Sequence, residues 1–319
     1  MSDSHAQGYP VRDSGDAWVE SPDGRKFWGR FGAAGLLVHD PARGVLLQHR
    51  ANWSHFGGTW GIPGGARHEG ESAVDGAIRE AGEEAGVPNA SIELRFDSLL
   101  DLGFWSYTTV IAEAVEPFDA VVSDPESIAL EWVPVDEVDA LPLHPGFADS
   151  WPGLRSQLER SVTVVVDVAN VVGSRPDGWW KDRAGAAGKT LDRLERLAQA
   201  GVDASSLDLD YHRWWPSYVA VLEGQARGAR GGAGHDVVGS SDAVAGGAAS
   251  ARASVRTVDA AGSGDDAIVD IVDGLAGAVV VVTSDRGLRE RVEALGASVR
   301  GAGWLLERFD ELDGAQAAS

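Results

Sequence analysis

Three glutamates, Glu80, Glu83 and Glu84, lie within the short segment "REAGEEAG" (79–86). On a helix, the spacings i, i+3 and i+4 place side chains on one face. Like charges at these spacings destabilise a helix by roughly 0.2–0.5 kcal/mol per pair when nothing neutralises them. A divalent cation reverses that effect, because Mg²⁺ prefers carboxylate oxygens together with substrate phosphates. Taken alone, however, a glutamate-rich face is most often solvated surface.

The segment belongs to a longer pattern of fixed spacings. From the amino end, the pattern reads Gly65, Glu71, Arg79-Glu80-Ala81, Glu83-Glu84 and Gly86-Val87, separated by five, seven, one and one residues. This pattern resembles the signature box of the Nudix hydrolases. "GTWGIPGG" before the box and "EWVPVDEV" after it are also similar to that family, so the resemblance covers about residues 30–160.

The resemblance implies a fold, a reaction and a set of metal ligands. The expected fold is an α/β/α sandwich around a mixed sheet, with the box as a loop–helix–loop. The family hydrolyses a nucleoside diphosphate linked to a further group, splitting a pyrophosphate bond with Mg²⁺ or Mn²⁺. The implied metal ligands are Glu80, Glu83 and Glu84, with the carbonyl of Gly65 as an additional ligand.

Two further residues of the box have structural roles by the same resemblance. Arg79 lies one turn before Glu83 and can also reach back toward Glu71, so Arg79 and Glu71 would orient the loop against the helix. Glu80 has an alternative role as the base that activates water, because this role varies within the family. Carboxylates suit such chemistry, since metal ions neutralise the charge of a pyrophosphate and lower the pKa of a bound water.

The sequence does not identify the nucleotide that the domain would bind. Several aromatic residues near the box could form a platform for base stacking, although core packing or loop anchoring is the more common role of any single one. They are Trp53, His55, Phe56, Trp60, Phe104 and Trp105. Glu131, in "EWVP", lies where some relatives place a further carboxylate.

Acidic residues also follow buried strands in the second half of the chain. "SVTVVVDVANVV" and "GAVVVVTSD" are β-branched runs, which are typical of strands buried on both faces of a parallel sheet. In open α/β sheets, ligands bind beyond the carboxyl ends of the strands. The candidate metal-binding or catalytic residues at these ends, and on a later helix, are Asp167, Asn170, Glu223, Asp266, Asp270 and Asp285.

These segments resemble the NYN/PIN-like nuclease domains, with D-x-x-N after the first strand, an acidic pair on a middle helix and T-S-D-R after a late strand. The resemblance implies a Rossmann-like parallel sheet and one or two Mg²⁺ ions for cleavage of RNA. Glu223 departs from the more usual Asp, and Asp285 could simply cap the following helix. RNA binding without cleavage therefore stays open as a second interpretation of this domain.

The length of 319 residues predicts two domains. We expect a flexible tail over residues 1–25, a Nudix domain over 26–160 and a PIN/NYN-like domain over 161–319. A helix is expected over 71–85, because its apolar residues form one stripe at 100° per residue. Residues 228–252 are rich in Gly, Ala and Ser and predict a mobile loop.

The composition narrows the class of protein. The formal net charge is −22, with −15 on residues 1–160 and −7 on the rest, which argues against a general nucleic-acid coat or a binder of anionic membranes. The chain has no cysteine, which excludes disulfides and thiolate metal sites and fits a cytoplasmic location. No apolar run reaches about 18 residues, so no membrane segment is expected.

A nucleotide-derivative sensor with a non-catalytic effector domain is the alternative from another class. Sensors of that kind often have eroded boxes and a basic partner domain. Here the box is complete and the second half has a net charge of −7, so catalysis is favoured. The sequence makes no prediction about oligomeric state.

Overall fold

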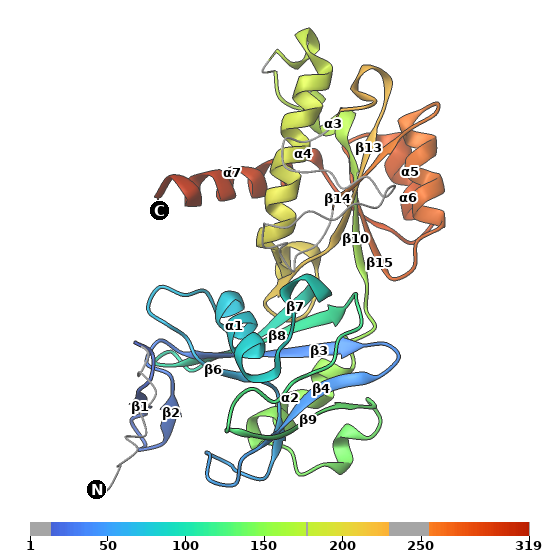
Figure 1. Cartoon of the computed structure of the whole chain (residues 1–319). Helices are drawn as coiled ribbons and strands as arrows, with labels where there is room; N and C mark the ends of the chain where they lie inside the picture. The colour runs from blue at the N-terminus through green and yellow to red at the C-terminus, as the bar shows by residue number, and fades with distance from the viewer. Residues whose placement is uncertain (1–13, 177, 230–254, 319) are drawn as a thin grey trace, which may run out of the picture. The chain divides into compact units, whose positions relative to one another are not determined.

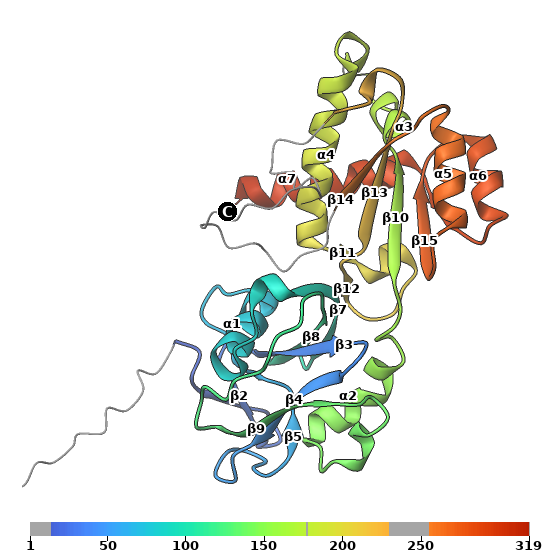
Figure 2. The same ribbon diagram turned by 45° about the vertical axis from the view of Figure 1, so that its right-hand side comes forward.

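The computed structural model describes residues 14–176, 178–229 and 255–318 (Figures 1 and 2). The chain divides into two compact units: one runs to Ser91 and resumes over Asp97–Arg155, and the other joins Ile92–Phe96 to the residues from Ser156 onward. The sequence did not predict that Ile92–Phe96 would belong with the second half of the chain. No helix among the described residues is both long and apolar enough to cross a bilayer.

The first unit contains a mixed sheet built around β3 (Ala33–Asp40), as the sequence predicted. β3 pairs in parallel with one neighbour and antiparallel with two others, and it is buried at seven of its eight positions. The other strands of this unit are β4 (Gly44–Arg50), β5 (Trp60–Gly61), β6 (Gly64–Ala66), β8 (Ser106–Ala114) and β9 (Ser127–Val133). Strand β7 (Ile92–Asp101) is divided between the two units.

The predicted box helix is α1 (Ala73–Ala85). It begins where the side chain of Ser72 accepts a hydrogen bond from the backbone N–H of Asp75, and it ends at Gly86, which has φ 64°. Both are ordinary helix boundaries, because Ser satisfies a free N–H and glycine adopts the left-handed conformation without strain. The alanines of its inner stripe are fully buried against β3, β6 and β8, so one face of the helix is fixed.

An N-terminal hairpin replaces most of the described part of the predicted flexible tail. Strands β1 (Trp18–Glu20) and β2 (Lys26–Trp28) pair antiparallel, and Trp18 lies opposite Trp28 with ring centroids 5.1 Å apart. The prediction was wrong here because two tryptophans facing each other supply cross-strand contact that the polar composition of the segment hides. Residues 1–13 of the predicted tail lie outside the described residues.

The second unit contains a fully parallel sheet with the strand order β14-β13-β10-β15-β16. Its strands are β10 (Val162–Asp167), β13 (Ser217–Leu222), β14 (Val255–Asp259), β15 (Ala278–Val282) and β16 (Ser298–Arg300). The chain adds strands on one side of β10 and then returns to add strands on the other. The predicted parallel sheet is confirmed, and its strand order reverses at β10, the point at which sheets of this kind bind ligands.

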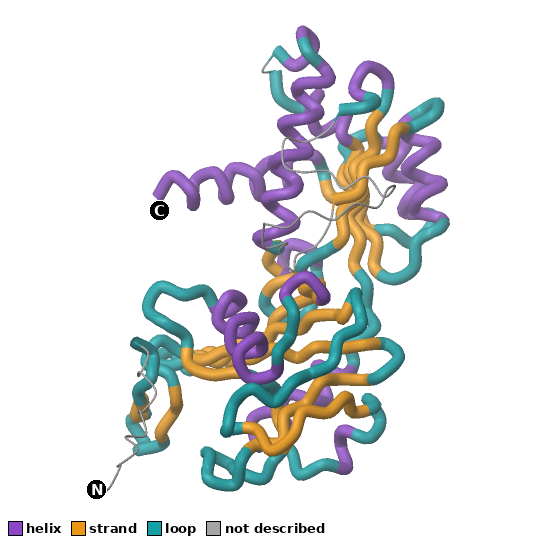
Figure 3. Tube along the Cα trace, in the orientation of Figure 1, coloured by secondary structure: helices purple, strands orange, loops and turns teal. Residues whose placement is uncertain are grey.

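Helices cover both faces of this parallel sheet (Figure 3). Helices α5 (Gly264–Asp273) and α6 (Arg286–Glu293) pack on one face through an apolar core that includes Val165, Ile268 and Leu288. The opposite side carries α3 (Val168–Gly173), α4 (Arg183–Ala200) and α7 (Ala302–Ala318). Most of the predicted loop 228–252 lies outside the described residues.

Aromatic contacts explain why the first half of β7 belongs to the second unit. Phe96 stacks on Trp214 of β12 (Arg213–Trp214) with ring centroids 4.8 Å apart. The backbone N–H of Trp215 donates to the carbonyl of Arg95 at 2.9 Å. β12 also pairs antiparallel with β11 (Val202–Asp203). Strand periodicity alone cannot reveal such a partner, because it does not say which chain segment supplies the neighbouring edge.

Candidate active site

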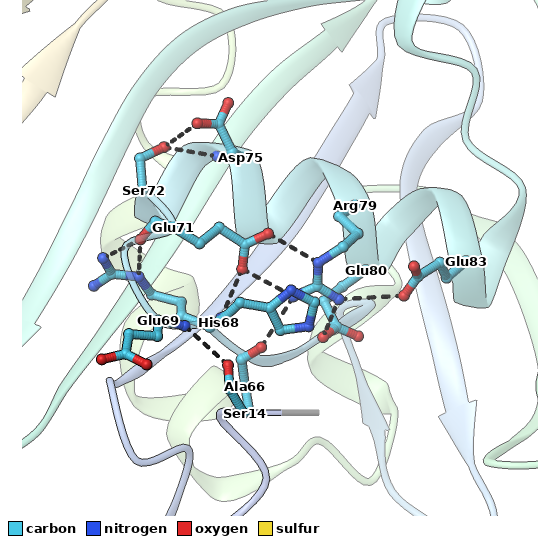
Figure 4. Close-up of polar contacts among 11 residues, drawn as sticks. Ser14, Ala66, His68, Glu69, Glu71, Ser72, Asp75, Arg79, Glu80 and Glu83 are labelled. Carbon is cyan, nitrogen blue, oxygen red and sulfur yellow. Dashed lines mark hydrogen bonds and ion pairs between the residues drawn. The ribbon is translucent and has the colours of Figure 1, made fainter. Parts of the chain in front are cut away.

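Arg79 is the centre of the polar network around the box (Figure 4). Its guanidinium contacts both carboxylate oxygens of Glu71, at 2.9 and 3.0 Å, and also donates to the carbonyl of Ala66 at 3.0 Å. On the helix side it contacts Glu80 at 2.8 Å and Glu83 at 3.2 Å. One side chain thereby ties the loop before the helix to the acidic face of the helix.

Glu71 is the loop residue that Arg79 binds, and we call this Arg79–Glu71 ion pair the arginine brace. The hydrogen bonds from Arg79 lower the pKa of the Glu71 carboxyl, against the opposing effect of burial. Its Oε2 also accepts the backbone N–H of His68 at 2.9 Å. A carboxylate with a bidentate arginine partner and a backbone donor is held in one orientation, so the loop has little freedom to move away from α1.

Glu80 and Glu84 are both largely buried. Burial, followed by the charge of Glu80, raises the pKa of Glu84 to about 8, although the backbone N–H of Gly64 donates to Glu84 Oε2 at 3.0 Å. Burial also raises the pKa of Glu80, opposed by its contact with Arg79. Glu83 differs, because 63% of its side-chain surface is exposed and its one described contact is with Arg79. The three glutamates of the box are therefore unequal.

Gly65 lies directly against the carboxylate of Glu80. A Cβ atom at position 65 would stand 2.7 Å from the Glu80 carboxylate, a distance at which something must shift. Gly65 belongs to β6, where it pairs with Ala34 of β3, so the sheet fixes its backbone. The glycine is required for close approach: it brings the backbone of the loop to the acidic helix.

The arrangement fits a divalent cation. Burial and the charge of Glu80 both disfavour the ionised form of Glu84, and of these two carboxylates Arg79 contacts only Glu80, so a dication would relieve the remaining electrostatic cost. Gln48 Oε1 is buried without a partner in the described part of the chain, although its Nε2 donates to Glu84 at 3.3 Å. Among the described residues, no three acidic or histidine side chains already form a complete ligand set, since Glu83 is engaged by Arg79.

Four residues near the box were not found by sequence analysis. Gln48 and Arg50 lie at the end of β4, and the Nε of Arg50 donates to the carbonyl of His55 at 3.2 Å while the guanidinium forms no ion pair with a described residue. Glu126 and Tyr107 complete the group: burial raises the pKa of each. Polar residues at the end of an otherwise apolar strand were the available signal for Gln48 and Arg50.

The further carboxylate near the box is Glu126 rather than Glu131. Glu131 is exposed on β9. Glu126 precedes β9, and its charge contributes to the raised pKa of Glu84, after burial and the charge of Glu80. Spacing within "EWVP" could not identify Glu126, because the preceding loop has no regular geometry.

The second unit gathers several of its candidate acids at the carboxyl ends of the parallel strands. Asp167 is the last residue of β10 and accepts the N–H of Asn170 at 3.0 Å and the hydroxyl of Thr283 at 2.9 Å. Asn170 accepts the N–H of Ser284 at 2.8 Å, and Asp285 caps α6 through the N–H of Leu288. These contacts join the ends of β10 and β15.

Two other predicted acids lie apart from this group. Asp266 forms an ion pair with Arg291 at 2.7 Å, and Asp270 is exposed on the following turn of α5. The neighbouring Asp265 is instead close to the group: burial raises its pKa, followed by the charges of Asp285 and Glu223. Glu223 accepts the N–H of Gly264 at 2.8 Å. The helical phase of α5, one residue off the predicted pair, decides which aspartate faces the strand ends.

The mixed sheet carries a glycine loop against an acidic, arginine-braced helix, an arrangement suited to holding a metal ion against a phosphate group. The NUDIX domain model matches residues 29–154, which include all of these elements. The chain belongs to the Nudix family and is a pyrophosphohydrolase. The match ends at residue 154, so it does not cover the part of the second unit from Ser156 onward.

The curated relatives agree with this family. The putative 8-oxo-dGTP diphosphatase 3 of Mycobacterium tuberculosis is 50% identical over 156 residues, which are 46% of this chain and 71% of that protein. A nucleoside triphosphate pyrophosphatase/Nudix hydrolase fusion protein of Bifidobacterium longum is 43% identical over 164 residues, 48% of this chain and 33% of that protein. A solved Nudix hydrolase from M. smegmatis is 50% identical, with a TM-score of 0.41, and the match covers 44% of this chain and 94% of the solved chain.

Proposed function

We propose that the first unit hydrolyses a pyrophosphate bond in a nucleoside diphosphate derivative with the help of Mg²⁺ or Mn²⁺. The observation that carries this proposal is the burial of Glu80 against Gly65 and of Glu84 against the backbone N–H of Gly64, at an electrostatic cost that a dication would remove. Glu80, Glu83 and Glu84 would hold the ion, with the Gly65 carbonyl as an additional ligand. The bound ion would neutralise the pyrophosphate and lower the pKa of a water molecule.

The protein's own contribution is positioning. Arg79 and Glu71 fix the loop against the helix, so the carboxylates and the Gly65 carbonyl keep a constant separation. Arg50 lies close enough to Glu84 for its charge to oppose the rise of the Glu84 pKa, yet it forms no ion pair with a described residue. Its terminal nitrogens are suited to contact a phosphate oxygen, because a guanidinium presents paired donors to such groups.

The names of the relatives suggest which substrates to test. A panel of nucleoside triphosphates, including 8-oxo-dGTP, and of nucleoside diphosphate derivatives should be incubated with Mg²⁺ or Mn²⁺ and assayed for phosphate or pyrophosphate release. Glu83→Gln and Glu84→Gln should remain folded and lose at least about 100-fold in turnover. Glu69→Gln, an exposed glutamate of the same loop, is the matched control. Unchanged turnover in both box variants would refute the proposal.

We also propose that the second unit is a PIN-like domain that cleaves RNA with a divalent metal. The observation in favour is that Asp167, at the end of the central strand of the parallel sheet, lies close enough to Asp265 and Glu223, from two other segments, for their charges to raise its pKa. Burial is the first cause of the raised pKa of Asp167, and the charges of Asp265 and Glu223 add to it.

The full chain provides the test of this second activity. RNA should be cut in the presence of Mg²⁺ or Mn²⁺, and Asp167→Asn and Asp285→Asn should abolish the cleavage. Glu84→Gln is the control, because it removes a carboxylate of the first unit and should leave RNA cleavage intact. RNA that is bound but not cut by the parent protein would support the non-catalytic interpretation instead.

A further inference from the structure

Five aromatic side chains form a continuous row in the first unit. Each ring contacts the next, with centroid separations of 5.1, 5.4, 4.2 and 4.8 Å along the row. The row comprises, in this order, Trp28, Trp18, His55, Phe56 and His144. These residues come from the N-terminal hairpin, the loop after β4 and the turn before α2 (Pro145–Arg155), so three separate segments meet in one aromatic row.

The row keeps apolar surface in contact with solvent. Trp18 is 48% exposed and Phe56 is 46% exposed. Phe56 also has φ 56°, a left-handed backbone conformation that is unfavourable for a bulky residue. Exposed aromatic rings held by a strained backbone are features that core packing does not explain, and strain of this kind clusters at binding sites.

The His144 end of the row lies beside Gly61, in the segment that precedes the box helix. A Cβ atom on Gly61 would lie 3.6 Å from the Cβ of His144 and 4.0 Å from the Cδ of Arg50, so both side chains flank this glycine. Gly64, three residues later, donates its N–H to Glu84. Three extended residue steps span at most about 11 Å. The segment Gly61–Gly64 therefore has the acidic helix at one end and Arg50 with the aromatic row at the other.

From the acidic helix to the aromatic row, the side chains change from anionic to cationic to neutral. Glu84 and Glu80 lie at the acidic end, and Arg50 follows as a cation without an ion-pair partner among the described residues. Burial lowers the pKa of His144 to about 4 and also lowers the pKa of His55, with the charge of Arg50 adding to both effects. The two histidines are thus neutral at pH 7. A metal-bound phosphate, a second phosphate and a neutral planar base would meet these three environments in turn.

We propose that the aromatic row is the nucleobase subsite of the hydrolase, with a purine stacked on Trp18 and Phe56 and the adjacent phosphate held by Arg50. This inference rests on the proposed nucleotide hydrolysis and adds the part of the substrate that is recognised. A purine is the favoured occupant because its two fused rings offer more surface for stacking than the single ring of a pyrimidine. Stacking also accounts for the exposure of the rings, which the base would cover.

Binding of nucleoside monophosphates tests the inference without any catalytic step. Tryptophan fluorescence in the presence of EDTA would report the affinity for GMP and AMP, with ribose 5-phosphate as the base-free comparison. The parent protein should bind the purine nucleotides more tightly than ribose 5-phosphate. Trp18→Ala and Phe56→Ala should each weaken purine nucleotide binding by roughly 5- to 100-fold and leave the binding of ribose 5-phosphate unchanged.

Three further variants separate recognition from folding. Trp53→Ala is the matched control, because Trp53 lies in the same loop, is 68% exposed and has no ring contact with a described residue. Trp18→Phe keeps an aromatic face and should retain most of the affinity. If Trp18→Ala fails to fold, Phe56→Leu decides, because it removes the ring and preserves apolar bulk.

The outcomes distinguish this inference from the proposed function. If the parent protein hydrolyses nucleoside triphosphates while the Trp18 and Phe56 variants keep the parent's purine affinity and kcat/KM, the subsite is wrong and the hydrolase remains. Equal affinity of the parent for GMP and ribose 5-phosphate would also overturn the subsite. If the parent hydrolyses no nucleotide with either metal, the proposed function itself fails.

Discussion

The two acidic groups of this protein are held together by different means. In the first unit, the carboxylates project from one helix, and a single arginine links Glu71, Glu80 and Glu83. In the second unit, Asp167 and Glu223 come from different strand ends, and backbone N–H groups and a hydroxyl hold them. One site is organised by spacing along the chain and a fixed counter-charge, and the other by sheet topology.

This difference has an energetic consequence. An arginine brace stabilises the acids before any ligand arrives, whereas neutral donors compensate a buried carboxylate only in part. Burial raises the pKa of Asp167 despite its two hydrogen bonds, and the same cause raises the pKa of Glu84, which Arg79 does not contact. The arginine therefore contacts Glu71 and the exposed Glu83 but not Glu84, the most deeply buried carboxylate of the box.

Among the variants that distinguish the two acidic groups, Gly65→Ala should cause the largest loss of turnover. The added methyl group would stand 2.7 Å from the Glu80 carboxylate and displace it from the loop. Because a misplacement of about 1 Å at a reacting centre can cost 100-fold, we expect turnover to fall by about 10- to 100-fold. Any RNA cleavage by the second unit should be unchanged in the same protein, as measured by parallel assays.

Gly82→Ala is the matched control for that variant. Gly82 lies in α1, and a Cβ atom there would approach the carbonyl of Val87 to an ordinary 3.8 Å. Alanine in a helix interior should raise the free energy of unfolding by up to about 1 kcal/mol, without loss of turnover. If Gly82→Ala inactivates the enzyme as strongly as Gly65→Ala, close approach at Gly65 is not the cause.

Glu71→Gln should expose the contribution of the arginine brace. The pKa of Glu71 is lower in the folded protein than its ordinary value of 4.5. Its carboxylate therefore stabilises the fold above pH 4.5, and this contribution is lost as the pH falls through the folded-state pKa. At pH 7 the variant should lose about 1–3 kcal/mol in the free energy of unfolding, measured with urea, and the difference should vanish in acid. A difference that is independent of pH would assign the loss to packing.

Asp167→Asn should have a smaller effect of opposite sign. The folded-state pKa of Asp167 lies above its ordinary value of 3.8, so the ionised group makes the fold less stable as the pH rises through this range. Asparagine can still cap α3, and its neutral side chain avoids the charges of Asp265 and Glu223. Without divalent metal at pH 7, the free energy of unfolding should rise by about 1 kcal/mol. A loss of stability would show that hydrogen bonding outweighs charge repulsion here.

The sequence predicts best those features that depend on local spacing. The box helix follows from its apolar periodicity and the parallel strands from their β-branched runs, and the structure confirms both. Gln48, Arg50 and Glu126 approach the box only through tertiary structure, so no spacing rule identifies them. Asp265 illustrates an intermediate case, because its helix was predicted but the rotation of that helix by one residue was not.

The N-terminal hairpin shows a different limit of sequence analysis. Its tryptophans lie among polar and glycine residues, so the composition predicts a tail. Pairing between Trp18 and Trp28 outweighs that composition, because a cross-strand aromatic contact stabilises two short strands that have little propensity of their own. Whether such a pairing forms depends on a turn and a partner, which a count of residue types does not include.

The position of Ile92–Phe96 affects where this protein can be cut into two fragments. A cut at residue 155 or 160 would leave Phe96 on one fragment and its stacking partner Trp214 on the other. Neither fragment would then be self-contained, and each would expose an aromatic surface that promotes aggregation. A boundary placed by the chain order alone would therefore separate these five residues from the unit to which they belong.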